Sequence, residues 1–471
     1  MIGENESPFG VAWFILYGYS GVPPAIYMPQ LRELGAGFTK VYLFWQQIEP
    51  EPGRFDWSAL NAFVEQLATP EEGLISIFSA SQWATERPSA ILPPSPAKDL
   101  EEYYRFVRRT VERCRGRVRY WQNDAEPNNP VFWSGTKEQF VAQLRVFYRA
   151  VKDGDPDAVV VVGGYDGMFV PPEMVLLPGM RMEPFPQQEK SLAFFDYVLR
   201  EGGNAFDIFD LRLYGDPYSI VARVEHMRRR MQANGYDKPI ICTEYGGPNL
   251  FEFRENHQYR ELVEHWSPPQ DPRITERIQE LYANMAALPP QTQMFMLDCP
   301  AELDAKYQRI QSRSIVMRNV LALSAGVRKT LYWDLLDVHG ETCDLMTLMY
   351  AKIGLLGLEG EALTRRTLSA DVFARMAQIL AEVRSVRRVA TPEHESVFLF
   401  EVDRGARGPL HVAWERRDAF SGEDLPPRPF DWDWVAPSAT ATDAFGAPVP
   451  VAVEHGRIRV LLSITPLYVE A

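Results

Sequence analysis

Short, uninterrupted apolar runs alternate with longer amphipathic stretches over about the first 390 residues of the chain. Eight such runs begin at Phe9, Thr39, Gly73, Arg117, Ala158, Phe206, Lys238 and Arg328. They are rich in Val, Ile, Phe and Tyr and lack a polar residue at every second position. Runs of this kind are typical of strands buried on both faces of a parallel sheet.

The stretches between these runs carry apolar residues at three- and four-residue spacing, which predicts helices over 56–68, 99–114 and 136–152. Asp56 is a candidate N-cap, and Thr136 with Gln139 fits a capping box. Eight strands alternating with helices predict a (β/α)8 barrel. A doubly wound open sheet is the competing architecture, but no GxGxxG or P-loop pattern follows the first run.

The last eighty or so residues have a different pattern. From about Ser396 the chain reads as short strands separated by turn residues, including the Pro- and Trp-rich segment 426–438. We therefore predict a barrel over 1–388, with its last helix ending near Arg388, and a small β-sandwich-like domain over 389–471. Trp432 and Trp434 are expected to pack this domain onto the barrel.

Composition narrows the classes of function. The 471 residues include 49 Lys and Arg against 63 Asp and Glu, a formal charge of −14, which argues against a nucleic-acid partner. No apolar stretch reaches the roughly 18 residues of a membrane helix. The N-terminus has neither the basic start nor the apolar segment of a signal peptide, so we expect a cytoplasmic protein unless a leader is removed.

Cysteine and histidine positions give no sign of a metal or cofactor. Cys114, Cys242, Cys299 and Cys343 lie far apart, and the seven histidines form no HExxH pattern. The four cysteines are expected to be free thiols. We expect no metal and no cofactor, and the sequence leaves the oligomeric state open.

Two acidic residues follow predicted strands at the end where a (β/α)8 enzyme carries its reacting groups. Glu126 follows the fourth run, and Glu244 ends the seventh. Barrel closure brings such strand ends together. Two facing carboxylates are what glycosidic bond cleavage requires, one protonated to assist the leaving oxygen and one ionised to attack the anomeric carbon.

Four segments resemble the clan A glycoside hydrolases, the retaining (β/α)8 glycosidases, and the family 39-like branch in particular. They are FWQQIEPEPGRFDWSALNAFV from Phe44, YWQNDAEPNNPVFW, IICTEYGGPN and LYWDLLD. The resemblance implies that Glu126 is the acid/base and Glu244 the nucleophile. It also implies that Trp333 lines the sugar subsite and that Tyr214 supports the nucleophile.

The chain departs from this family at three positions. Ala125 stands where the clan has an Asn that binds the sugar 2-hydroxyl, Arg212 replaces a His on the sixth strand, and Tyr42 replaces an Arg on the second. Asn123 and Asn128 are candidates to substitute for the missing amide.

Four further side chains are candidate substrate contacts. Arg212 could face an acidic sugar or lie ion-paired beneath the site. Trp45 and Trp83, at or just past strand ends, and Trp333 could stack on a pyranose or fill the barrel mouth or core.

The sequence therefore predicts a retaining β-glycosidase acting on short glycosides by double displacement, with a carboxylate separation of roughly 5–5.5 Å. Long connections after the fifth strand (168–189) and the seventh (245–306) favour a closed, exo-acting pocket. Two alternatives remain open. The chain could be a carbohydrate-binding pseudoenzyme, or a transglycosylase or phosphorylase on the same scaffold. The sugar and its linkage are not fixed by the sequence.

Overall fold

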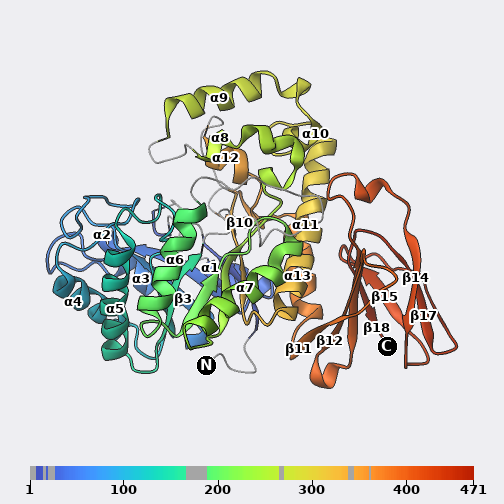
Figure 1. Ribbon diagram of the computed structural model, residues 1–471, viewed down its shortest axis with the longest axis horizontal. Coiled ribbons are helices and arrows are strands. Elements are labelled where there is room, and N and C mark those ends of the chain that lie inside the picture. Colours follow the sequence, from blue (N-terminus) through green and yellow to red (C-terminus); the bar gives the residue numbers. More distant parts are fainter. Residues whose placement is uncertain are drawn as a thin grey trace.

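The computed structural model describes residues 7–13, 17–19, 27–165, 188–264, 270–337, 344–359 and 362–471. Its centre is a closed barrel of eight parallel strands in sequence order (Figure 1). The strands are β1 Phe9–Ala12, β2 Phe38–Phe44, β3 Gly73–Phe78, β4 Tyr120–Asn123, β5 Val159–Tyr165, β6 Ile208–Leu211, β7 Ile240–Tyr245 and β8 Thr330–Tyr332. The predicted (β/α)8 barrel is confirmed.

Helices of the βα units surround the barrel (Figure 1). They are α1 Tyr27–Glu33, α2 Trp45–Ile48, α3 Ser58–Val64, α4 Leu100–Arg113, α5 Lys137–Gly154, α6 Gln188–Gly202, α7 Ile220–Ala233, α11 Ala301–Ser324 and α13 Leu368–Ile379. The capping box that the sequence predicts at Thr136 is present at the start of α5. Asp56 does not cap α3, whose N-cap is Trp57, because α3 begins two residues later than predicted.

One apolar layer fills the end of the barrel at which the strands begin. Its members come from β2 to β8 and are Phe38, Leu74, Tyr120, Val159, Val161, Ile208, Ile241 and Leu331. Because side chains alternate along a strand, the next inward position is two residues further on. There the barrel is polar, and the fully buried side chains are Lys40, Ser76, Gln122, Asp210 and Thr243. The polar layer of the barrel interior therefore lies directly next to this apolar layer.

The connection between β7 and β8 is largely helical rather than an irregular loop. It comprises η6 Leu250–Glu252, η7 Arg254–Tyr259, α8 Glu261–Glu264, α9 Pro272–Ala283, η8 Met285–Ala287 and α10 Pro290–Gln293, and it leads into α11. In Figure 1 the segment α8–α10 projects beyond the barrel together with α12 Leu345–Tyr350. A hairpin of β9 Leu356–Glu359 and β10 Ala362–Arg366 follows α12.

The C-terminal domain consists of two antiparallel sheets. The first has the order β11-β12-β13-β18-β15 and the second β14-β17-β16. Their strands are β11 Ser385–Val389, β12 Val397–Asp403, β13 Leu410–Glu415, β14 Arg428–Asp433, β15 Thr440–Asp443, β16 Val451–Glu454, β17 Arg457–Leu462 and β18 Leu467–Glu470. The predicted β-sandwich-like domain is confirmed.

The five-stranded sheet is buried on both faces. Along β12, Phe398, Phe400 and Val402 join the apolar core of the barrel, whereas Val397 and Leu399 face the three-stranded sheet. Against the barrel, Trp414 donates to the Tyr218 hydroxyl at 3.1 Å. The sheet is therefore the layer through which the two parts of the chain share an interior.

Trp432 and Trp434 do not pack the domain onto the barrel, and that prediction is wrong. Both are buried between the two sheets, where their rings lie 5.9 and 5.3 Å from that of His411. Strand alternation turns them inward from β14 and its end, away from the barrel.

The last helix before this domain, α13, ends at Ile379 and not near Arg388. Glu382 takes a left-handed backbone conformation, φ 61°, which a helix cannot continue through. From Ser385 the chain then forms β11, which pairs with β12. We propose that the accessory domain starts at this strand rather than at residue 389.

An ion-pair cluster joins α11 to the accessory domain. Glu423 accepts from Arg309 at 2.8 Å and from Arg313 at 2.6 Å, and Lys306 lies 3.6 Å from it. Burial opposes ionisation of this carboxylate, but the two arginines outweigh it and lower the pKa of Glu423 to about 2. Arg313 is only 3% exposed, so its charge depends on this partner.

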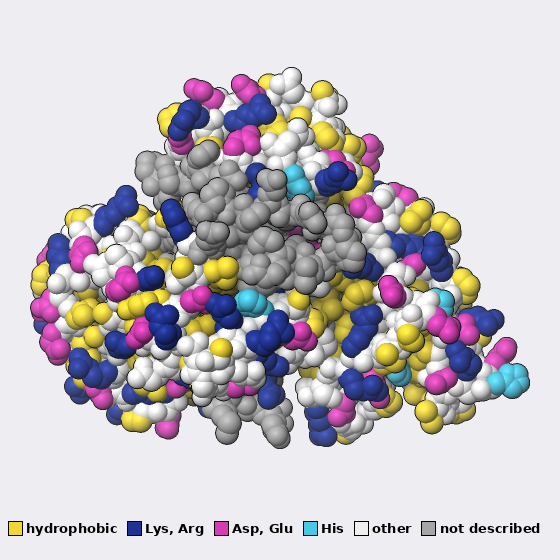
Figure 2. Space-filling model, viewed as in Figure 1, with side chains coloured by type: hydrophobic (Ala, Val, Ile, Leu, Met, Phe, Trp, Pro, Cys, Tyr) yellow, Lys and Arg dark blue, Asp and Glu magenta, His cyan; other side chains and the backbone are white. Residues whose placement is uncertain are grey.

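On the face shown in Figure 2, Lys and Arg side chains are interspersed with Asp and Glu. Among the described residues, no helix is long and apolar enough to cross a membrane.

We expect Glu423→Gln to lower the free energy of unfolding at pH 7 by about 2 kcal/mol, because it leaves Arg313 buried without a counter-charge. Since the folded pKa of Glu423 lies below its ordinary value, its stabilisation is present at neutral pH. It is lost as the pH falls from about 4.5 to about 2. Urea unfolding at several pH values measures both effects. Asp424→Asn, at a more exposed partner of Lys306, is the control and should change little.

Candidate active site

Glu126 lies just after the C-terminal end of β4 and Glu244 lies near the C-terminal end of β7. Each side chain is 7% exposed. Strict alternation from Ile241, which is in the interior layer, would turn Glu244 outward. However, β7 has one more residue than β8 between the pairs Cys242–Thr330 and Tyr245–Tyr332. This bulge turns both Thr243 and Glu244 into the barrel.

Four side chains hold the Glu244 carboxylate. Oε1 accepts from Lys40 at 3.1 Å and from the Tyr42 hydroxyl, and it lies 2.6 Å from Arg212 Nη1. The Tyr214 hydroxyl donates to Oε2 at 3.2 Å. The predicted contact between Tyr214 and Glu244 is therefore present, and Oε1 carries most of the interactions.

These contacts keep Glu244 ionised. Burial alone would raise the pKa of Glu244, but Arg212, Lys40 and the Tyr42 hydrogen bond outweigh it, and its pKa lies below the ordinary value. Burial also lowers the pKa of Lys40, to about 8. An ionised carboxylate in this position is a ready nucleophile or counter-ion.

Arg212 lies between the two glutamates. Its Nη1 contacts Glu244, and its Nε lies 3.5 Å from Glu126 Oε1. The side chain is fully buried, so it is the ion-paired residue beneath the site that the sequence analysis allowed. Because one guanidinium contacts both carboxylates, Glu126 and Glu244 lie beside the same buried side chain.

Backbone shape makes room for this arginine. β5 has an extra residue relative to β6 between Val162 and Tyr165, where Gly163 and Gly164 lie. A Cβ on Gly164 would lie 2.3 Å from Arg212 Nε, and one on Gly163 would lie 2.5 Å from the Ala125 carbonyl oxygen. Only glycine permits these approaches.

Asp210 anchors the arginine from below. Its Oδ2 accepts from Gln122 at 2.8 Å and from the Thr243 hydroxyl at 2.7 Å, and lies 3.6 Å from Arg212 Nη1. Its Oδ1 accepts from the Thr243 backbone N–H at 2.8 Å. The Thr243 hydroxyl in turn accepts from Arg212 and Lys40, at 2.7 and 3.0 Å. The charges beneath the carboxylates thus form one hydrogen-bonded network.

Trp333 follows β8 and is 8% exposed. Its ring meets those of Tyr214 and Tyr350 edge-on, with centroids 6.5 and 5.0 Å away. The peptide bond from Trp333 to Asp334 is cis. The indole thus contacts Tyr214, which donates to Glu244, and a role for Trp333 in a sugar subsite stays a prediction.

The two candidate amides have protein partners. Asn123 donates to Asp124 Oδ2 at 2.6 Å, and Asn128 donates to Ser191 Oγ on α6 at 3.2 Å. Ala125 itself lies in an apolar cluster with Tyr42, Phe44, Phe78 and Ala80. The surroundings of Ala125, the residue before Glu126, are therefore apolar. A substrate contact by Asn123 or Asn128 stays a prediction.

Trp45 and Trp83 lie together outside this group. Trp45 is fully buried, stacks on Phe106 at 4.9 Å and donates to Glu49 at 2.9 Å. Trp83 is partly exposed, meets Trp45 edge-on and donates to the Glu49 carbonyl oxygen at 3.0 Å. The contacts of Trp45 place it in the core beneath α4, the second of the two roles that the sequence analysis left open, whereas part of Trp83 remains accessible.

Sequence reasoning missed Lys40, Asp210 and Thr243. A signal was present, because Lys40 and Asp210 are charged residues inside runs that otherwise predict strands buried on both faces. Lys40 also precedes Tyr42 by two residues, so both point to the same face of β2.

The described residues contain no group of three or more His, Cys, Asp or Glu side chains that could hold a metal ion. Cys114 and Cys242 are buried free thiols and Cys299 is partly exposed, while Cys343 lies outside the described residues. Most of the connection 168–189 also lies outside them.

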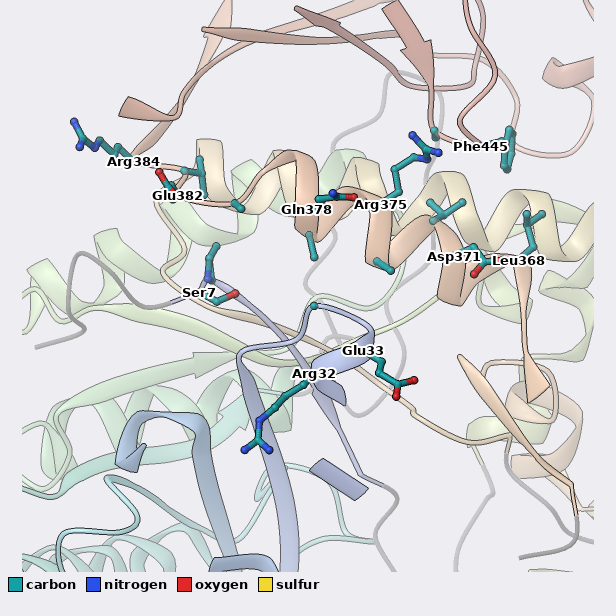
Figure 3. Close-up of a pocket in the computed structure, with 18 residues that line it drawn as sticks. Ser7, Arg32, Glu33, Leu368, Asp371, Arg375, Gln378, Glu382, Arg384 and Phe445 are labelled. Carbon is teal, nitrogen blue, oxygen red and sulfur yellow. The ribbon is translucent and has the colours of Figure 1, made fainter. Parts of the chain in front are cut away.

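A pocket of about 1130 Å³ lies elsewhere, between α13, the start of the barrel and the accessory domain (Figure 3). It is lined by Ser7, just before β1, and by Arg32 and Glu33, which precede β2. It therefore lies at the end where strands begin, opposite Glu126 and Glu244.

Solved structures with the same fold support the class of architecture. The chain is similar to a family 39 glycoside hydrolase from Bacteroides cellulosilyticus WH2, with 15% identity, a TM-score of 0.63 and coverage of 100% of this chain and 82% of that one. It is also similar to a family 39 β-xylosidase from Caulobacter crescentus, with 12% identity, a TM-score of 0.53 and coverage of 98% and 96%.

A glucosidase from Croceicoccus marinus matches with 14% identity, a TM-score of 0.53 and coverage of 99% and 95%. No family model and no curated protein matches the chain. The chain shares the fold of these glycosidase structures, a (β/α)8 barrel with a C-terminal β domain.

We expect Asp210→Asn to lower the free energy of unfolding by about 3 kcal/mol, because an amide NH2 in place of Oδ2 would face other donors and remove the buried partner of Arg212. Urea unfolding measures this loss. Thr243→Val, which removes one hydroxyl bonded to charged groups but keeps the Asp210 charge, should cost less, about 1.5 kcal/mol. Equal effects of the two variants would contradict a special role for the Asp210 charge.

Proposed function

We propose that the protein is a retaining β-glycosidase in which Glu244 is the nucleophile and Glu126 the acid/base. The observation that carries this proposal is the pair of buried carboxylates at the ends of β4 and β7, joined through Arg212. A short distance between carboxylates suits direct attack, whereas an inverting enzyme needs room for a water. Two groups that contact one guanidinium are compatible with the former. The fold similarity to glycoside hydrolases supports the same reaction class.

The environment of Glu244 suits its attack on an anomeric carbon. Of the described residues, only Tyr214 donates to Oε2, while Oε1 receives Tyr42, Lys40 and Arg212. Oε2 is therefore the oxygen that is available to form the new bond. The cations keep the carboxylate ionised, and the tyrosines fix its orientation.

The reaction then has two displacements. In the first, Glu244 Oε2 bonds to the anomeric carbon, the glycosidic C–O bond breaks, and the Glu126 carboxyl proton passes to the leaving oxygen. In the second, Glu126 takes a proton from water, the water oxygen bonds to the anomeric carbon, and the ester to Glu244 breaks. Trp333, held between Tyr214 and Tyr350, would stack on the sugar ring.

The helical segment between β7 and β8 supports exo-action on a short glycoside. It starts immediately after the nucleophile strand, and α8, α9 and α10 project beyond the barrel (Figure 1). A segment of this size at the catalytic end restricts how long a substrate can lie across the strands.

A second candidate function is carbohydrate binding without turnover. The observation in its favour is the apolar cluster around Ala125, which offers no amide to a sugar hydroxyl beside Glu126. That contact strengthens in the transition state, so its absence would affect turnover more than binding.

We expect one or more nitrophenyl β-glycosides from a panel of xyloside, glucoside, galactoside, mannoside, fucoside, arabinoside and glucuronide to be hydrolysed. Glu244→Gln should lower kcat/KM at least about 1,000-fold, because the nucleophile is lost. Release of nitrophenol measures the rate. Sugar binding without hydrolysis, unchanged by Glu244→Gln, would favour the binding protein instead.

We expect Glu126→Gln to keep slow hydrolysis of the same glycoside, about 100-fold below wild type, since nitrophenol needs little acid assistance but the second step loses its base. Added azide, which needs no base, should restore the rate and give a β-glycosyl azide. Proton NMR identifies the anomer of this product. An α-glycosyl azide, or no effect of azide, would contradict the retaining mechanism.

A further inference from the structure

Arg212 makes ion contacts to both Glu126 and Glu244. It is fully buried, and a guanidinium stays protonated throughout the ordinary pH range. A charge in this position cannot be screened by solvent or switched off by pH. Its effect on the two carboxylates is therefore permanent.

The position of the guanidinium is fixed from several sides. Asp210 lies 3.6 Å from Nη1, and the Thr243 hydroxyl accepts from Nη1 at 2.7 Å. Gly164 provides the space for Nε. Arg223 on α7 donates to the backbone oxygens of Arg212 and Tyr214, which holds the end of β6 in place. These contacts hold the guanidinium beside both carboxylates.

The proposed reaction moves one negative charge between these two carboxylates. Before the first step Glu244 is ionised and Glu126 carries a proton. After it, Glu244 is a neutral ester and Glu126 is ionised, and the second step reverses the exchange. The two groups together hold one negative charge at every stage, and Arg212 contacts both ends of its path.

We propose that Arg212 is a positioning residue that holds the two carboxylates as one ion-paired unit and acts as the fixed counter-charge while negative charge passes between Glu244 and Glu126. This inference rests on the proposed glycosidase function and extends it to a residue at which the chain departs from its family. It assigns Arg212 no contact with the sugar.

Several other charged and titratable groups surround Glu126 and Glu244. Glu244 also faces Lys40 and Tyr42 from β2, Tyr214 after β6 and Asp334 after β8. Tyr214 faces Glu126 as well, and Asp210 faces Arg212. Burial raises the pKa of Asp334 well above its ordinary value, which favours the neutral form of this carboxyl.

Lys40 offers a matched comparison. It is buried like Arg212, and its ammonium donates to Glu244 Oε1 at 3.1 Å and to the Thr243 hydroxyl at 3.0 Å. Removal of the Lys40 charge should therefore act on the nucleophile alone, whereas removal of the Arg212 charge should act on both carboxylates.

The first test is the pH dependence of kcat/KM on an alkyl β-glycoside of the sugar that the panel identifies, because a poor leaving group requires the acid. The low-pH limb reports loss of activity as Glu244 is protonated, and the high-pH limb reports loss as Glu126 is ionised. In Arg212→Gln both pKa values rise without the cation, so both limbs should move about one unit to higher pH. In Lys40→Met only the low-pH limb should move.

Arg212→Lys separates the two contacts. A single ammonium can keep the pair with Glu244 but cannot also reach Glu126 as the guanidinium fork does. The low-pH limb should stay near that of wild type, and the high-pH limb should move upward. A merely structural role for Arg212 would lower the rate in both variants without moving either limb.

The second test reads the ion pairing without any substrate. The protein is labelled with [δ-13C]glutamate, and the two carboxyl signals are assigned by difference from Glu126→Gln and Glu244→Gln. The pair should titrate as coupled groups in wild type, and both signals should titrate at higher pH in Arg212→Gln. If the Gln variant does not fold, Arg212→Lys replaces it, and there only the Glu126 signal should titrate at higher pH.

The outcomes are distinguishable. Hydrolysis with a shift of the Glu244 signal and the low-pH limb alone would overturn the inference and leave the glycosidase function intact. Coupled titration without hydrolysis of any glycoside would overturn the function, and with it the role of Arg212 in charge transfer. Coupled titration together with movement of both limbs supports both.

Discussion

The constraint on which the rest of the site depends is that Glu244 must be ionised in a place almost without water. Burying a carboxylate favours its neutral form, and only nearby opposite charges and hydrogen bonds reverse that preference. The chain supplies them from opposite sides of the barrel, Lys40 and Tyr42 on β2 and Arg212 just after β6. Those cations are themselves buried and need Asp210 and Thr243 beneath them. The need to keep Glu244 ionised thus determines which residues form the polar layer inside the barrel.

Most of the architecture could be predicted from the sequence because it follows from burial. Strands covered on both faces read as continuous apolar runs, and the eight runs gave the eight barrel strands. The errors lie where local pattern and tertiary contact compete. The stretch after Ile379 carries apolar residues that a helix could also present, but Glu382 breaks the helix and pairing with β12 decides the outcome. Trp432 and Trp434 were correctly expected to be buried, yet nothing local states which of two cores they enter.

The candidate site was predictable in its two carboxylates and much less in what surrounds them. Glu126 and Glu244 come at strand ends, and topology alone brings strand ends together. The side to which a residue points depends on register, and the bulge in β7 reverses the alternation at Glu244. The bulge in β5 likewise could not be predicted from the sequence, because it depends on the contact of Gly164 with Arg212. The link from Lys40 to Glu244 spans 204 residues of sequence, and those from Arg212 to Glu126 and Glu244 span 86 and 32, so no short motif contains them.

The five-stranded sheet has a consequence for how this chain can change over evolutionary time. Many accessory domains are connected to a catalytic domain by a linker alone and can be exchanged by recombination within that linker. Here β12 and β13 serve as the outer wall of the barrel on one face and as half of a sandwich on the other. A crossover between barrel and β domain would cut through a shared interior and expose Phe400 and Trp414. The two parts are therefore bound to be inherited together, as a single unit of selection, despite their distinct architectures.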